Sequence, residues 1–257
     1  RYDGQRGLAW TPDGRIVYHS LAGGGDDIWI MNGDGTGQRQ LTDGTGNNIF
    51  PDVSPDGRYI VYSSSEREGS YGLWRMNLDG SGARLLMPDG ALSSVSPDSR
   101  WVLCYKGPRV TVWRVPLDGG EPEQVRMPAG GQTTAPYISP DGRLVAYNYR
   151  TSAPGAQWQI AVFPFEGGDA PVKVFDVPGS PVRQLRWTPD GRAICHIDTR
   201  QGVSNIVCLP LDGRPPFPVT DFKADLIDAF DWSPDGRRLA LARLNSSGGV
   251  VLISNAK

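Results

Sequence analysis

The chain has 257 residues, of which 26 are basic and 28 acidic, and its net charge is −2. This balance gives no electrostatic reason to expect binding to nucleic acid or to an anionic membrane. No apolar run approaches the length of a transmembrane helix, and no signal-peptide pattern occurs. The 33 glycines and 22 prolines stand beside 39% hydrophobic residues, which favours a folded domain with many tight turns over a disordered chain.

A hairpin signal recurs along the whole chain. In the copy PDVSPDGRYIVYSS, at 51–64, proline fixes φ at the first central position of a turn, aspartate bonds to nearby backbone, and glycine adopts the left-handed conformation. The prolines of the six copies are at positions 12, 55, 97, 140, 189 and 234. Their spacing is typical of propeller blades, which repeat about every 40–50 residues.

A second signature follows each of the first five turns. It is an apolar strand that ends in Asp-Gly or Glu-Gly, such as IWIMNGDG from Ile28 and LWRMNLDG from Leu73. With a short outer strand after it, each unit predicts four strands, and no helical periodicity of useful length appears. We therefore predict an all-β chain that forms a six-bladed β-propeller of four-stranded antiparallel blades. The single domain spans 1–257, with blades at about 7–42, 49–87, 93–127, 134–175, 183–220 and 228–257.

The last blade is expected to be incomplete in this chain. Residues 250–254 match the third strand of a blade, and no outer strand follows them. In the register of the other repeats, that outer strand falls before residue 1. We expect residues upstream of Arg1 to close the ring.

Large residues recur at fixed positions of the repeat. A position that takes tryptophan in several blades is most simply part of the core between blades, and an aromatic platform for a ligand is the alternative. The two histidines occupy a position that holds tyrosine or cysteine in other blades, so a packing role is favoured over a metal site. The residues concerned are Trp10, Trp187 and Trp232; Trp29, Trp74 and Trp113; and His19 and His196.

Three local features leave alternatives open. Cys195 and Cys208 lie almost symmetrically about a hairpin, so a disulfide is possible in an oxidising compartment, but two unpaired core cysteines are favoured. Ser99 replaces the turn glycine, which implies a strained or a reshaped turn. The insertion at 151–159 is interpreted as a tolerated surface loop, with a cap over one face as the alternative.

The repeats differ most just before each turn, where the inner strand of a propeller blade borders the central channel. Three and six residues before the prolines, side chains of opposite charge occur in different blades. We predict a ligand-binding site at the channel mouth, with a self-neutralising rim as the alternative. No catalytic, metal-binding or cofactor motif occurs, so none is assigned. The candidate ligand-binding residues are Arg6, Asn48, Asp52, Tyr137, Arg183, Arg186, Asp228 and Asp231.

The Ser-Pro-Asp-Gly-Arg turn and the WRMNLDG strand resemble the TolB-like propeller repeat over essentially the whole chain. More narrowly, YDGQRGLAWTPDGRIVY, IDTRQGVSNIVCLPLDG, FDWSPDGRRLALAR and the ending VVLISNAK resemble the C-terminal propeller of bacterial membrane-spanning serine/threonine kinases and related regulators. The resemblance implies a periplasmic or extracytoplasmic sensor or protein-interaction domain that is linked to an upstream effector. No kinase motif occurs in this chain.

We therefore expect a non-enzymatic binding or sensor domain of a larger signalling protein, without direct insertion into a membrane. Its partner would be a protein, a peptide or a small polar ligand. One alternative is an enzyme-associated propeller, which either gates a peptidase or holds a metal as in some polysaccharide lyases. Another is a spacer between other domains.

Overall fold

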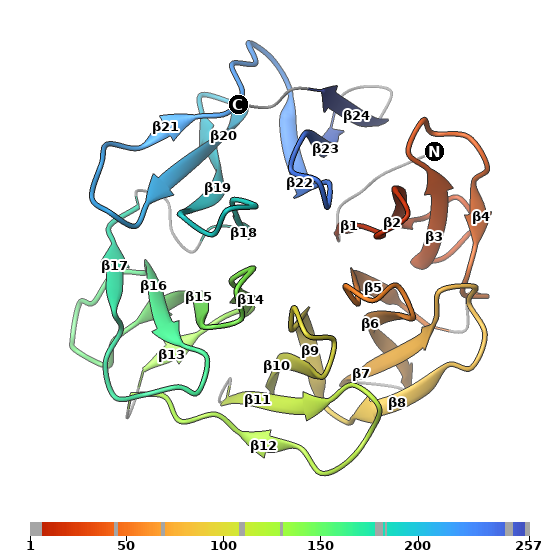
Figure 1. The fold of residues 1–257 in the computed structure, drawn as a ribbon, viewed down its shortest axis with the longest axis horizontal. Coiled ribbons are helices and arrows are strands. Elements are labelled where there is room, and N and C mark those ends of the chain that lie inside the picture. The colour runs from red at the N-terminus through yellow and green to blue at the C-terminus, as the bar shows by residue number, and fades with distance from the viewer. Residues whose placement is uncertain are drawn as a thin grey trace.

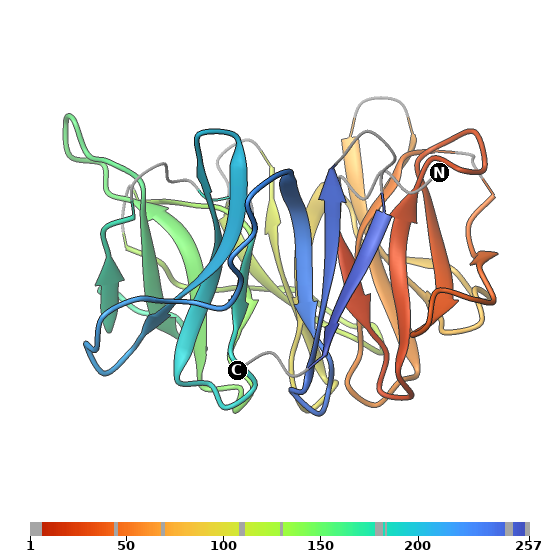
Figure 2. The ribbon, with the colours of Figure 1, turned by 90° about the horizontal axis from the view of Figure 1, so that it is seen from above.

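The computed structural model describes residues 7–43, 46–67, 70–107, 111–128, 131–177, 182, 184–244 and 249–254. Within these ranges the chain forms antiparallel sheets arranged around a central axis, with the first and last sheets side by side (Figure 1). Seen from the side, the strands run between the two faces of a flat ring (Figure 2). The described ranges contain no helix that is long and apolar enough to cross a membrane.

Each sheet is built from strands that are consecutive in the sequence. The first three are β1 (Leu8–Trp10), β2 (Arg15–Ser20), β3 (Asp27–Asn32) and β4 (Arg39–Gln40); β5 (Asn48–Val53), β6 (Tyr59–Arg67), β7 (Ser70–Asn77) and β8 (Arg84–Met87); and β9 (Gly90–Val95), β10 (Trp101–Lys106), β11 (Thr111–Pro116) and β12 (Glu123–Gln124). The others are β13 (Gln132–Thr133), β14 (Tyr137–Ile138), β15 (Leu144–Arg150), β16 (Gln159–Pro164) and β17 (Lys173–Phe175); β18 (Leu185–Trp187), β19 (Ala193–Arg200), β20 (Val203–Pro210) and β21 (Phe217–Pro218); and β22 (Leu226–Trp232), β23 (Arg238–Leu244) and β24 (Gly249–Ser254). The strands of each sheet pair in sequence order, except that β13 and β14 both pair with β15.

The predicted all-β propeller is confirmed, but the prediction of six four-stranded blades is wrong. Five sheets reach four strands or more, whereas the sheet β22–β24 has three within the described ranges. The described chain therefore forms five complete blades, and a three-stranded sheet occupies the remaining place in the ring. Closure by residues upstream of Arg1 concerns no described residue and stays a prediction.

The repeated turn is held by its own side chains. Ser54 Oγ accepts a hydrogen bond from Tyr59 N at 2.9 Å and donates one to Asp56 Oδ1 at 2.7 Å. Gly57 has a φ of 72°, and its N–H donates to Ser54 O at 2.8 Å. These bonds satisfy the polar groups of a reversal that has no ladder partners, which explains why serine or threonine, aspartate and glycine recur together.

The turns of neighbouring blades also touch. A Cβ added to Gly142 would lie 3.6 Å from Pro97 Cδ, and one added to Gly236 would lie 2.9 Å from Pro189 Cγ. Ser99 keeps the geometry of the turn, with a φ of 56°, so the strained alternative holds there. Its Oγ accepts a hydrogen bond from Asp56 N of the preceding blade at 3.0 Å, which offsets part of the strain.

Gly236→Ala is expected to destabilise the fold more than the matched change Gly142→Ala. Both alanines would adopt a positive φ, which costs about 1 kcal/mol. The alanine at 236 would also overlap a rigid proline ring, which adds about 1–2 kcal/mol. Urea denaturation of the two variants measures the difference, and equal losses would contradict the close contact with Pro189.

The repeated large residues fill the spaces between the sheets. Trp10 packs with Ala229, Ala240 and Ala242 of the last sheet, and Trp187 packs with residues of β15 and β16. These contacts confirm the predicted core between blades. His19 and His196 are 1% and 4% exposed, which confirms that their position in the repeat is a packing position.

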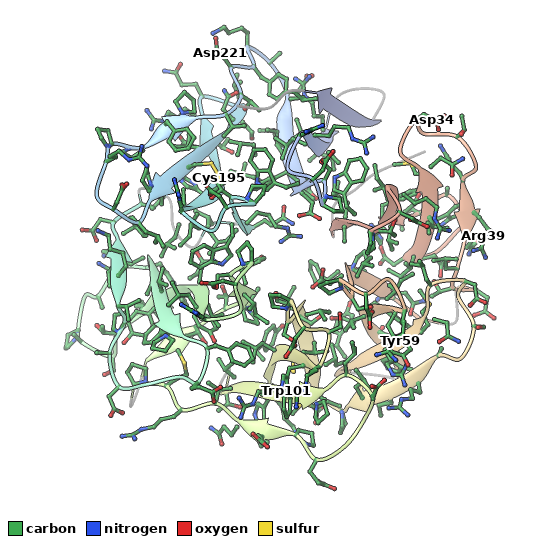
Figure 3. All side chains as sticks on the ribbon, in the orientation of Figure 1. Asp34, Arg39, Tyr59, Trp101, Cys195 and Asp221 are labelled. Atoms are coloured by element: carbon green, nitrogen blue, oxygen red, sulfur yellow. A yellow bond between two sulfur atoms is a disulfide. The ribbon has the colours of Figure 1, made fainter. Side chains whose placement is uncertain are left out.

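Cys195 and Cys208 form a disulfide, so the preference for unpaired cysteines is wrong (Figure 3). The pairing of β19 with β20 places the two residues directly opposite each other, and both are fully buried. Residues that face each other across an antiparallel ladder bring their Cβ atoms close together. Cys104 is a free, buried cysteine.

A polar pocket in the central channel as the candidate functional site

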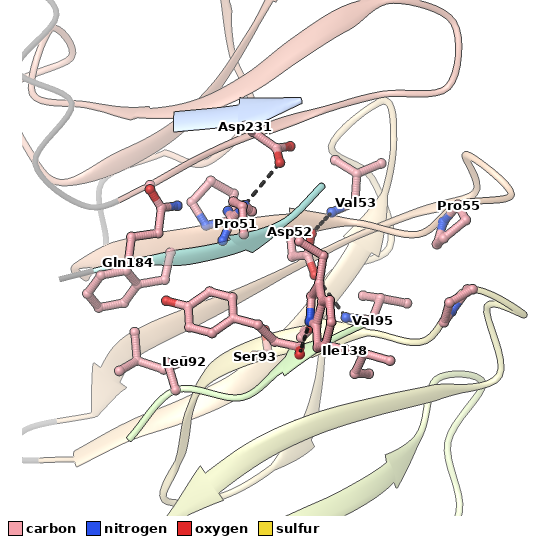
Figure 4. A pocket seen from close by; sticks show the side chains of 18 of the residues that line it. Pro51, Asp52, Val53, Pro55, Leu92, Ser93, Val95, Ile138, Gln184 and Asp231 are labelled. Atoms are coloured by element: carbon pink, nitrogen blue, oxygen red, sulfur yellow. Dashed lines mark hydrogen bonds and ion pairs between the residues drawn. The ribbon is translucent and has the colours of Figure 1, made fainter. Parts of the chain in front are cut away.

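The inner strands of the blades bring their blade-specific residues to one pocket of about 400 Å³ (Figure 4). Five of the six residues that lie three positions before a turn proline line it. They are Asp52 of β5, Ser94 of β9, Tyr137 of β14, Arg186 of β18 and Asp231 of β22. The predicted convergence of oppositely charged side chains on the channel is therefore present in the structure.

Arg186 and Asp231 form an ion pair in this pocket. Arg186 Nε donates to Asp231 Oδ1 at 3.0 Å, and the two side chains are 19% and 20% exposed. The guanidinium also donates to Leu185 O at 3.0 Å and to Leu8 O at 3.4 Å, and it lies 5.4 Å from the centre of the Tyr137 ring. Its orientation is thus fixed by contacts on several sides.

Asp52 is held in a different way. Its Oδ1 accepts from Val53 N at 2.9 Å, and its Oδ2 accepts from Val95 N of the next blade at 2.8 Å. No basic side chain within the described ranges lies within ion-pair distance of this carboxylate. Asp52 is therefore the carboxylate of the pocket that lacks a direct counter-ion.

Burial sets the ionisation of these groups. Desolvation raises the pKa of Asp52 to about 6, although the charge of Arg186 and the two backbone hydrogen bonds act in the opposite direction. Desolvation also raises the pKa of Asp231 and of Tyr137. Burial acts to lower the pKa of Arg186, but the charge of Asp231, the neighbouring Tyr137 and Asp52, and the hydrogen bond to Asp231 together outweigh it and raise that pKa. Keeping the Asp52 carboxylate ionised in this pocket therefore costs free energy of desolvation.

The same side chains join neighbouring blades. Asp231 Oδ2 accepts from Trp10 N at 3.1 Å, and Ser94 Oγ accepts from Ile138 N at 3.2 Å, as Asp52 does from Val95 N. An inner strand is the edge of its sheet, so these N–H groups have no ladder partner, and an acceptor from the adjacent blade satisfies them. Part of the role of these residues is therefore structural.

The eight predicted site residues divide into three groups. Asp52, Tyr137, Arg186 and Asp231 line the pocket together. Asn48 and Asp228 do not: they are 4% and 6% exposed, and Asn48 Nδ2 lies 3.4 Å from Asp27 Oδ1 of the first blade. Arg6 and Arg183 fall outside the described residues.

A second ring of pocket residues was missed from the sequence. It lies five positions before the turn prolines, two before the first ring, and alternate residues of a strand share a face. A search at intervals of two residues along each inner strand would therefore have identified this ring from the sequence. The positions compared, three and six residues before each proline, are three apart and so lie on opposite faces of the strand. The residues are Gly7, Phe50, Leu92, Ala135 and Gln184.

The described residues bring no three histidine, cysteine, aspartate or glutamate side chains together in a group that could hold a metal ion. The exposed loop between β15 and β16, which contains the insertion, contributes nothing to the lining of the pocket. What the pocket offers is a buried carboxylate, an amide, hydroxyls and an aromatic ring. These groups are suited to binding by hydrogen bonds and charge.

The fold and the pocket define a β-propeller built on a repeated Pro-Asp-Gly turn. Residues 5–163 match the model of the TolB beta propeller domain, so the chain belongs to this family. The further likeness to the propeller of membrane-spanning kinases is not among the relationships that these comparisons show.

Two curated relatives illustrate the range of the match. An uncharacterized protein of Agrobacterium fabrum is 36% identical over 155 residues, which cover 54% of this chain and 52% of that protein. The Tol-Pal system protein TolB of Anaeromyxobacter dehalogenans is 42% identical over 91 residues, which cover 35% of this chain and 20% of that protein. The matches thus span about half the length of the first relative and a fifth of the second.

Solved structures share the fold at low identity. TolB from Acinetobacter baumannii superposes with a TM-score of 0.69 at 19% identity, covering 82% of this chain and 53% of that one. An oligogalacturonate lyase in complex with manganese superposes with a TM-score of 0.63 at 16% identity, covering 100% of this chain and 76% of that one. Likeness at this level of identity concerns the architecture alone.

Proposed function

We propose that this chain is a non-enzymatic binding domain whose channel pocket receives a segment of a protein partner. The observation that carries the proposal is the pocket itself. The repeated residues build turns and core, while the residues that differ between repeats gather on one concave polar surface. Concave sites with a few convergent polar groups are the usual places of ligand binding in folded domains.

A protein or peptide partner is favoured over a small polar ligand. The pocket of about 400 Å³ has room for one or two residues of a polypeptide, and its lining includes the amide of Gln184, which can bond to a peptide backbone. The chain belongs to the TolB beta propeller family and is similar to the Tol-Pal system protein TolB, and both relationships support a protein partner.

The proposed location is outside the cytoplasm. The buried Cys195–Cys208 disulfide is the supporting observation, because such bonds persist in oxidising compartments and are rare in reducing ones. In this setting the domain would act as a sensor for a signalling protein, with an effector linked upstream, as the resemblance to the C-terminal propeller of membrane-spanning kinases implies.

An enzymatic function has less support. The likeness to a manganese-bound lyase concerns the fold, and the described residues gather no metal-ligand group. A peptidase-gating role requires a hydrolase domain in addition to this propeller. Neither function is tied to a specific feature of the pocket.

Selection of peptides from a randomised 12-residue display library tests the proposal. We expect the enriched peptides to bind the wild-type domain and to lose binding on Ser93→Phe, which fills the pocket. Ser152→Phe, in the exposed loop after β15, is the matched control and should bind as the wild type does. Failure to enrich any peptide, or equal binding to Ser93→Phe, would contradict a peptide site in the channel.

A further inference from the structure

The described lining of the pocket carries an excess of negative charge. Its charged residues are Asp52, Arg186 and Asp231, so two carboxylates face one guanidinium. Arg186 is bound to Asp231, and the excess charge therefore resides on Asp52. The two backbone N–H groups that hold this carboxylate are neutral donors and leave its charge in place.

An anion would find no free cationic partner among the described residues that line this pocket. The guanidinium of Arg186 already donates to Asp231 and to two main-chain carbonyls, and an incoming anion would have to displace one of these contacts. It would also lie close to both carboxylates. A cation beside Asp52 displaces no ion pair, because this carboxylate accepts only from two backbone N–H groups, and among the described lining residues only the charge of Arg186 opposes it.

A second group in the pocket lacks a partner. Gln184 is 8% exposed, and its Oε1 accepts from Phe230 N at 2.8 Å, which fixes the amide. Its Nε2 makes no hydrogen bond within the described part of the chain, although the side chain lines the pocket (Figure 4). Because this N–H group remains accessible from the pocket and has no acceptor among the described residues, it is available to donate to a ligand carbonyl.

We propose that this pocket is a subsite for the cationic side chain of a lysine or an arginine in a bound polypeptide, with the Asp52 carboxylate as its counter-ion and Gln184 Nε2 as the donor to a neighbouring peptide carbonyl. The inference rests on the proposed function and names the chemistry of the segment that the channel receives. A bare metal ion or a simple amine would satisfy Asp52 but leave Gln184 without an acceptor.

Blocked pentapeptides with a single variable residue test this subsite. Acetyl-Gly-Gly-Lys-Gly-Gly-amide and its arginine analogue are titrated into ¹⁵N-labelled protein, with glutamine and glutamate versions as controls. The indole N–H groups of Trp187 and Trp10 donate to Tyr137 O and Asp231 O, so their signals report on the pocket. We expect these two signals to shift with the basic peptides, with an affinity at least about tenfold above that of the glutamine peptide.

Asp52→Asn should remove the preference for basic peptides. The matched control Asp221→Asn changes an exposed aspartate on the outer rim, where its partner is Lys223, and should leave binding unchanged (Figure 3). If Asp52→Asn fails to fold, the pH dependence of peptide binding to the wild type still tests the role of Asp52.

Burial raises the pKa of the Asp52 carboxyl to about 6, so this group becomes neutral as the pH falls below that value, while lysine keeps its charge. Arg186, Asp231 and Tyr137 are the other ionisable groups that influence it.

We therefore expect binding of the lysine peptide to weaken about tenfold from pH 7.5 to pH 5. Binding that is independent of pH, or equal affinity for the glutamine peptide, would overturn the proposal. The proposed function would survive if library peptides without basic residues bind the pocket, and it would fail with the inference if no peptide binds there. The two failures are thus distinguishable.

Discussion

Removal of the Cys195–Cys208 disulfide is expected to lower the free energy of unfolding by about 3 kcal/mol. The bond closes a loop with a sequence separation of 13, and cross-linking a loop of about 15 residues reduces the entropy of the unfolded chain by about this amount. For a domain of this size, the loss corresponds to a fall in Tm of about 6–12 °C. The double variant Cys195→Ala with Cys208→Ala tests this by thermal and urea unfolding.

Cys104→Ala separates the bond from the buried volume. Cys104 is also fully buried but has a free thiol, so its variant loses packing without losing a cross-link. We expect a loss of about 1 kcal/mol per cysteine from packing. A double variant that loses no more than twice the cost of Cys104→Ala would contradict a stabilising bond. The unreduced, denatured wild type should titrate a single thiol, and three thiols would refute the bond itself.

Arg186→Met is expected to destabilise the fold by about 2–3 kcal/mol at pH 8. Methionine retains much of the apolar volume, but it leaves Asp231 without its ion-pair partner and Asp52 without the nearby positive charge. The pKa values of both carboxyls are already raised in the folded state, and loss of the guanidinium raises them further. The folded variant then binds protons more readily than the unfolded chain does.

The sign of the pH dependence follows from this. A carboxyl whose folded pKa is raised contributes stability below its unfolded pKa and loses it as pH rises through the folded pKa. The difference between wild type and Arg186→Met should therefore be small near pH 4 and widen towards pH 8. Urea denaturation at the two pH values measures it.

Arg114→Met provides the matched control. Arg114 is 20% exposed, close to the value for Arg186, but its partners Glu123 and Glu166 are 56% and 74% exposed. Carboxylates left in water cost little, so we expect a loss below about 1 kcal/mol from the ion pairs and little change with pH. Equal losses for the two variants would contradict a special cost of unpaired charge in the channel. Adding Asp231→Asn to Arg186→Met should recover part of the stability.

The architecture could be predicted because its determinants are local. The turn at 54–59 forms its hydrogen bonds within six residues, so each copy is recognisable without knowledge of the others. The prediction of six four-stranded blades was wrong because the turn pattern recurs six times whether or not a sheet gains its fourth strand. The disulfide was judged incorrectly because symmetry about a hairpin indicates facing positions but not the oxidation state of the pair.

The candidate site could be predicted in part. Asp52 and Arg186 were found because they differ from their counterparts in other repeats. Asn48 and Asp228 do not line the pocket, because register shifts within the ladders of β5 and β22 interrupt the regular alternation of side chains near these residues. Gln184 was missed because amides carry no strong signal in a sequence, although its separation of two from Arg186 placed it on the same face.

The variable side chain three residues before each turn proline is separate from the residues that form the turn. Each blade presents one side chain there, and the turn that holds it in place forms its bonds with other residues. Exchanging these side chains therefore leaves the hairpins intact. A few substitutions at these positions already give many different combinations of side chains in the pocket. A new binding preference can therefore be designed at these positions without rebuilding the hairpins, as long as each N–H group of a neighbouring blade keeps an acceptor.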